Sequence, residues 1–211
     1  MKMVYKYQKS GKLIYDESFK TIRSEADLSK FSKEEEVVVV RMIHASGIVA
    51  LTENVLFKPN VVSKARLALN MGAPILCDTK MVSEGITRAR LPNNNRVICT
   101  LGDTKVSSLA EEIGNTRSAA AVEMWKSEIK GAVVAIGNAP TALFHLLNLI
   151  NSGEIELPSV IIGCPVGFVG AKESKEALYH ECSIPSIVTS GRIGGSAITV
   201  AAINALASEV E

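Results

Sequence analysis

Apolar runs in the second half of the chain alternate with glycine turns and helix-like segments. Three runs, at 133–136, 160–162 and 187–189, each lead directly into a turn with one or more glycines. Continuous apolar runs of this length are typical of parallel strands that are buried on both faces. Their carboxyl ends share one edge of the sheet, where ligands bind in open parallel sheets. The pattern predicts a ligand site along this edge, and the free amides of the turns favour an anion.

The first half of the chain carries helix signals and two further strand-like runs. Ser32 and Glu35 have the spacing of a capping box, at the start of a helix that we expect to end at Gly47. The other elements expected are a helix that Asn60 can cap and that ends near Gly72, strands at 74–78 and 96–101, helical segments over 106–130 with a break near 114–115, and a last helix from Ser196.

Strands and helices alternate along most of the chain, which predicts an α/β fold. We expect a mainly parallel sheet of about five strands with helices on both faces. Neither an internal repeat nor a flexible linker divides the sequence, so residues 1–211 are interpreted as a single domain. Residues 1–30 are polar and lack a strong period, and we interpret them as an arm or short helix that packs on a partner.

Composition excludes several classes of function. The formal net charge is +1, so no overall field attracts nucleic acid. No apolar run approaches the roughly 20 residues that span a bilayer, and the N-terminus lacks a signal-peptide pattern, so we expect a cytoplasmic protein that does not bind membranes. The four cysteines include no C-x-x-C pair, which argues against a metal site. The glycine fingerprints of nucleotide-binding loops are also absent, so no cofactor is expected.

His44 is the most pointed candidate for chemistry among the three histidines. It falls in the last turn of the capped helix, and Arg41 lies one turn earlier on the same face. Two interpretations stay open from the residues alone. The imidazole could stabilise the negative end of the helix dipole. It could also act as a general acid or base, because histidine titrates nearest to neutral pH.

Arginines form a second signal. Arg88, Arg117 and Arg192 all fall in expected loops or at helix starts that follow strands. Lone surface arginines are usually only solvated charge. The guanidinium fork is also well suited to carboxylates, so the arginines favour a polycarboxylate or phosphate ligand.

Several strings in the sequence resemble those of one known family. They are RMIH at 41–44, GNTRSAA at 114–120, IGNAPTALF at 136–144, PVGFVGAKESK at 165–175, and GRIGGS at 191–196. In these strings the chain resembles the precorrin-8X methylmutases, which are also called precorrin isomerases or cobalt-precorrin-8 methylmutases. The resemblance runs from about Ile14 to about Leu206.

This resemblance implies a reaction and a site. A methyl group moves from C-11 to C-12 of a tetrapyrrole, which gives hydrogenobyrinate or its cobalt-containing counterpart without a cofactor. The resemblance further implies a homodimer with sites near the subunit interface and His44 as the catalytic residue. The substrate-binding residues that it implies are Ser18, Arg41, Thr87 and Arg117. The many carboxylate arms of such a ring further suggest Arg88, Arg192 and the glycine loop at Gly167 as partners.

Two other functions remain as alternatives. A corrinoid-binding or carrier protein would need the arginines and loops but not His44. A nucleotide-dependent enzyme is disfavoured by the missing fingerprints. The sequence leaves open whether the substrate carries cobalt.

Overall fold

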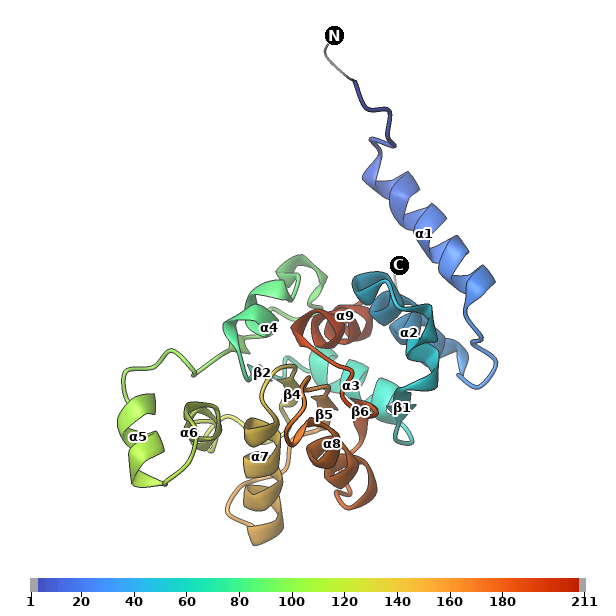
Figure 1. Cartoon of the computed structure of the whole chain (residues 1–211). Coiled ribbons are helices and arrows are strands. Elements are labelled where there is room, and N and C mark those ends of the chain that lie inside the picture. The colour runs from blue at the N-terminus through green and yellow to red at the C-terminus, as the bar shows by residue number, and fades with distance from the viewer. Residues whose placement is uncertain (1–3, 209–211) are drawn as a thin grey trace.

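Six strands form one sheet at the centre of the computed structural model, which describes residues 4–208 (Figure 1). The strands are β1 (Val55–Phe57), β2 (Ile75–Cys77), β3 (Val97–Ile98), β4 (Val133–Ile136), β5 (Val160–Gly163) and β6 (Ser186–Thr189). Their order is β1-β6-β5-β4-β2-β3, and every neighbouring pair is parallel except β1 with β6. The predicted α/β class and mainly parallel sheet are confirmed.

The sheet has six strands where about five were expected, because β1 could not be recognised in the sequence. Only three residues pair, with Val55 opposite Thr189 and Phe57 opposite Ile187. Three residues are too few for alternation or an apolar run to be recognised. Strand β1 runs antiparallel to β6 at the edge of the sheet, and its short run does not stand out from the turns around it.

Helices cover both faces of the sheet, as predicted. They are α1 (Gly11–Glu25), α2 (Lys33–Ser46), α3 (Val61–Asn70), α4 (Lys80–Gly85), α5 (Val106–Glu112), α6 (Arg117–Glu123), α7 (Pro140–Ser152), α8 (Ala171–His180) and α9 (Ser196–Ala207), with short 3-10 helices η1 (Val49–Glu53) and η2 (Arg88–Arg90). Val133 and Ala135 face the core beneath α2, α3 and α9, whereas Val134 and Ile136 face the core beneath α7 and α8. This alternation is the period-2 geometry of a strand buried on both faces.

The caps of two helices test the local predictions. The capping box of α2 is confirmed, because the Ser32 hydroxyl accepts from the Glu35 amide and the Glu35 carboxylate accepts from the Ser32 amide. Gly47 ends this helix with φ 68°. Asn60 does precede α3, but its side chain makes no capping hydrogen bond. Its backbone is left-handed, at φ 63°, so asparagine serves there as a residue that tolerates this conformation.

The polar N-terminal region contains a long helix. Ser10 caps α1, whose 15 residues project from the body of the molecule toward the N-terminus (Figure 1). Phe19 and Ile22 are its buried residues, which explains why no strong period appears in the sequence. The predicted arm is therefore a helix that contacts the body mainly through its second half. Residues 1–3 of that arm, and 209–211 of the predicted domain, lie outside the described residues.

Candidate active site

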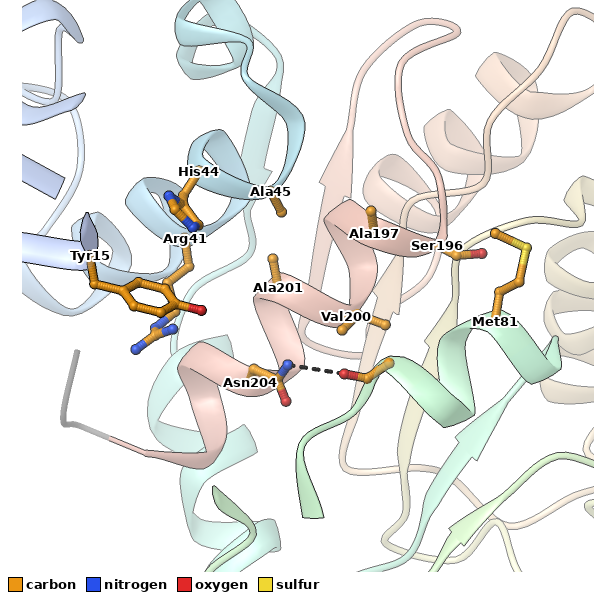
Figure 2. Close-up of a pocket in the computed structure, with 11 residues that line it drawn as sticks. Tyr15, Arg41, His44, Ala45, Met81, Ser196, Ala197, Val200, Ala201 and Asn204 are labelled. Carbon is orange, nitrogen blue, oxygen red and sulfur yellow. Dashed lines mark hydrogen bonds between the residues drawn. The ribbon is translucent and has the colours of Figure 1, made fainter. Parts of the chain in front are cut away.

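A cavity of about 410 Å³ lies between α1, α2, α4 and α9 (Figure 2). Eleven residues line it: Tyr15, Arg41, His44, Ala45, Met81, Gly85, Ser196, Ala197, Val200, Ala201 and Asn204. Small side chains of α9 make much of its wall, with Ala45 of α2 nearby. The absence of a side chain at Gly85 lets α4 approach α9, since a Cβ there would lie 2.8 Å from Val200 Cγ2.

His44 stands at the end of α2, and α1 supplies its surroundings. Ser18 Oγ lies 2.7 Å from His44 Nδ1. The rings of Tyr15 and Phe19 have centroids 5.2 and 5.3 Å from the imidazole. Tyr15, Ser18 and Phe19 are spaced i, i+3 and i+4, so they share one face of α1. With Nδ1 engaged by Ser18, Nε2 is the nitrogen left for a ligand.

Arg41 lies one turn before His44 and also lines the cavity. It is buried at 7% exposure, and its guanidinium carbon lies 5.4 Å from the centroid of Phe19. Stacking on an aromatic face lets a guanidinium stay charged while its edge is offered to an anion. Arg41 is the lone arginine or lysine among the eleven lining residues.

The sequence along nearly the whole chain identifies its family. The profile described as CbiC, precorrin-8X methylmutase, matches residues 13–209. The chain belongs to the precorrin-8X methylmutase family.

Individual members of this family are similar over nearly the whole chain. A precorrin-8X methylmutase from Sinorhizobium sp is 56% identical over 204 residues, which cover 96% of this chain and 97% of the relative. A cobalt-precorrin-8 methylmutase from Priestia megaterium is 37% identical over 92% of this chain and 85% of its own. The crystal structure of the precorrin-8X methylmutase from Thermus thermophilus superimposes with a TM-score of 0.85 at 39% identity, covering 93% of this chain and 95% of that one.

Two of the expected substrate-binding residues, Thr87 and Arg88, lie beside the pocket wall. The Thr87 amide donates to Asn204 Oδ1 at 2.9 Å, so Thr87 contacts a lining residue. Arg88 donates through one guanidinium nitrogen to the carbonyls of Ser83 and Ile86, at 2.7 and 2.8 Å. The Arg88 guanidinium thus closes the turn after α4 in this structure.

Three others lie away from this pocket within one chain. Arg117 begins α6, on the opposite side of the molecule from α2 (Figure 1), and donates to the Leu101 carbonyl at 3.4 Å. The Gly167 amide donates to the Arg192 carbonyl at 3.3 Å. The Arg192 guanidinium carbon lies 5.0 Å from the ring centroid of Phe168. None of the three lines the cavity beside His44.

The first glycine turn, after β4, is filled by the protein itself. Asp78, which directly follows β2, is buried at 1% exposure. Its carboxylate accepts the amides of Gly137, Asn138 and Ala139 at 3.0, 2.9 and 2.8 Å. Burial raises the pKa of the Asp78 carboxyl, and the three amides work against that rise. The expectation that this turn contributes amides to a ligand site is therefore wrong.

The second and third glycine turns, after β5 and β6, pack on each other. The Gly195 amide donates to the Cys164 carbonyl at 2.8 Å, and a Cβ at Gly194 would lie 2.3 Å from the same oxygen. Beneath them, buried Lys175 donates to the Ile193 carbonyl at 2.5 Å. Burial lowers the pKa of Lys175 to about 8. These contacts fix the loop that leads into α9 and thus into the pocket wall.

Several lining residues were not identified from the sequence. Tyr15 carried a usable signal, because it precedes Ser18 by three positions on a helix. Asn204 also carried a signal, because it is a single polar side chain in an otherwise apolar helix. In the structure its Nδ2 donates to the Gly85 carbonyl at 3.3 Å (Figure 2). Met81 carried no signal, since apolar residues at helix starts are common, and Ser196 was recognised only as the start of the last helix.

Residues 4–208 offer neither a metal-binding cluster nor a membrane span. No cluster of three or more His, Cys, Asp or Glu side chains there could hold a metal ion. Within the same range no helix has the length and apolarity to cross a membrane.

Proposed function

We propose that this chain is an isomerase that moves a methyl group from C-11 to C-12 of precorrin-8X, within cobalamin biosynthesis. The observation that carries the proposal is His44, held by Ser18 at the wall of a cavity, in a chain of the precorrin-8X methylmutase family. A carrier would have no need of an oriented imidazole. The relatives named for the metal-free substrate are 56% and 51% identical, against 37% for a cobalt-precorrin relative, which supports the metal-free substrate.

The geometry supports general acid assistance by His44. As imidazolium, its Nδ1–H donates to Ser18 Oγ, and its Nε2–H is free to donate to a ring nitrogen of the substrate. This hydrogen bond draws electron density from the conjugated ring and eases migration of the methyl group. General acid assistance of this kind contributes typically ~10²–10⁴ in rate. Holding the ring in the reactive geometry between α2 and α9 supplies the remainder.

The active assembly in this proposal is a homodimer. A tetrapyrrole with many carboxylate arms needs several cations, and Arg41 is the one arginine at the pocket wall. The first half of α1 projects from the body with Leu13, Ile14 and Tyr15 about half exposed, which suits packing on a second copy. Substrate contacts of Arg88, Arg117, Arg192, Thr87 and Gly167 remain predictions, with Arg117 able to act from the partner. A cytoplasmic location likewise remains a prediction.

Turnover and product binding of His44→Ala test the proposal. Conversion of precorrin-8X is followed by the visible spectrum, and binding of hydrogenobyrinate by titration. We expect turnover to fall at least about 100-fold, since the acid is removed, while product affinity changes less than about 5-fold. His180→Ala, which removes an exposed histidine from the end of α8, is the matched control. Near-normal turnover of His44→Ala would refute the acid assignment, and a wild-type protein that binds product without turnover would be a carrier.

A further inference from the structure

The start of α9 presents three backbone amides without an acceptor among the described residues. They belong to Ser196, Ala197 and Ile198, the first turn of a 12-residue helix whose first intrahelical donor is Thr199. Gly195 occupies the capping position, so no side chain caps them. Unpaired amides at a helix start carry the positive end of the helix dipole and favour an anion.

The Ser196 side chain is the second observation. It is 8% exposed, and no hydrogen bond to its hydroxyl occurs within residues 4–208. Ser196 nevertheless lines the cavity, and Figure 2 shows its oxygen on the side that faces Met81, across this end of the pocket. The hydroxyl lines the cavity and is not among the buried atoms that lack a partner, so a ligand carboxylate can accept its hydrogen bond in place of water.

The position of this end relative to His44 is also informative. Ser196 and Asn204 both line the pocket, and eight residues of helix separate them by about 12 Å. Arg41, His44 and Tyr15 lie near the Asn204 end of α9, whereas Ser196 and Met81 lie at the other (Figure 2). The pocket therefore runs along α9 from the catalytic histidine to an electropositive helix start.

We infer that the start of α9 is a carboxylate-binding subsite. The amides of Ser196, Ala197 and Ile198, together with the Ser196 hydroxyl, hold one carboxylate arm of the macrocycle while its reacting edge lies at His44. The identity of the ligand as a macrocycle rests on the proposed function; the anion chemistry of the subsite does not. A single contact at His44 would leave the flat macrocycle free to rotate in the plane of its ring. A second contact at this subsite fixes that rotation.

Two variants of Ser196 test the subsite in the full-length protein. Ser196→Ala removes the hydroxyl without adding bulk, and affinity for hydrogenobyrinate should fall about 3- to 10-fold. Ser196→Asp places a carboxylate where the ligand's would lie, and we expect a loss of at least about 30-fold through repulsion. Ser63→Asp is the control, because Ser63 is exposed in the first turn of α3, outside the pocket. Thermal unfolding confirms that each variant is folded.

A second measurement separates this proposal from the proposed function. Glutarate is titrated as a small dicarboxylate probe, and the amide resonances of Ser196, Ala197 and Ile198 are followed by NMR. Saturable shifts in the wild type that vanish in Ser196→Asp support the subsite, whether or not hydrogenobyrinate binds. Turnover by the wild type with unchanged product affinity in both Ser196 variants would overturn the subsite and leave the isomerase intact. Glutarate shifts without any hydrogenobyrinate binding would leave the subsite and overturn the function, and the absence of both overturns both.

Discussion

Two helix starts at the same edge of the sheet are built in opposite ways. Ahead of α7, the turn after β4 is held by a carboxylate, because Asp78 accepts the amides of Gly137, Asn138 and Ala139. Ahead of α9, the loop after β6 is held by a cation, because Lys175 donates to the Ile193 carbonyl. The Asp78 carboxylate engages the three amides just before α7, whereas the Lys175 contact to a carbonyl leaves the first-turn amides of α9 available.

The position of the two turns makes this difference instructive. The chain passes from β2 to β3 on one side and later to β4 on the other, so the crevice between β2 and β4 is the switch point of the sheet. Ligands commonly bind at such a point. Here Asp78 occupies it, and the cavity lies instead between the helices that pack around α9. A glycine turn at a strand end is thus a site only where the protein leaves its amides unpaired.

The largest effect is expected where the loop before α9 meets the turn after β5. Gly194→Ala places a Cβ 2.3 Å from the Cys164 carbonyl oxygen, a backbone atom that cannot move without breaking the interlock. We expect a loss of about 4 kcal/mol or more in the free energy of unfolding, measured in urea. Gly11→Ala, with open space around it, is the control and should cost nothing. Equal stability of the two variants would show that the two turns do not constrain each other.

Removal of the carboxylate from the filled turn comes next. Asp78→Ala leaves three amides without an acceptor, two of them in the buried residues Gly137 and Ala139, so we expect a loss of about 3–5 kcal/mol. The emptied turn then resembles the start of α9, and added acetate should raise the melting temperature of Asp78→Ala but not of the wild type. Asp103→Ala, which removes an exposed carboxylate that accepts the Lys105 amide, is the control. A failure of acetate to rescue Asp78→Ala would mean that the turn collapses without its carboxylate.

The cation beneath the other turn predicts a pH dependence. The folded pKa of Lys175 is lowered to about 8 from an ordinary value of 10.5, so between these values the unfolded chain binds more protons than the folded one. Stability should therefore rise with pH across this window, by about 1–2 kcal/mol after allowance for solvent screening. Lys175→Met should lack this rise, and Lys172→Met, at an exposed site on the same helix, should retain it. Unfolding free energies at pH 7.5 and 10 measure the difference.

The smallest effect on stability is expected at the open helix start itself. The Ser196 hydroxyl has no protein partner in the described structure, so Ser196→Ala should change the free energy of unfolding by less than about 0.5 kcal/mol. A loss above about 1 kcal/mol in urea titrations would reveal an intramolecular partner for the hydroxyl. The two starts would then be less different than their hydrogen bonds indicate.

The fold could be predicted from the sequence because its elements are long and their signals agree. The strands of the second half and the capped α2 follow directly from apolar runs and from Ser32 with Glu35. Strand β1 could not be predicted, since three residues carry no period. That Asp78 would fill the turn after β4 could not be predicted either. Asp78 follows a strand about sixty residues earlier, and its local sequence shows only a polar residue at the end of that strand.

The site was predictable only in part, for a different reason. His44 and Arg41 share a helix face by spacing, and the structure brings Ser18 to the same imidazole. Spacing does not say where a long side chain points. The guanidinium of Arg88 turns to carbonyls of its own loop, and that of Arg192 lies on Phe168. Residues such as Ser196 enter a site through the packing of distant turns, which no local pattern encodes.

The attachment of α1 determines how long Ser18 and His44 stay in contact. Phe19 and Ile22 are its buried side chains, and each contributes only about 1.5–3 kcal/mol of apolar burial. Detachment of α1 therefore costs less than opening of the sheet, and it proceeds as a local fluctuation of the native protein. Each such excursion separates Ser18 from His44 while the core stays folded. In a single chain we expect the lifetime of the Ser18–His44 contact to follow this peripheral helix, so heat or mild denaturant should break that contact before the core unfolds.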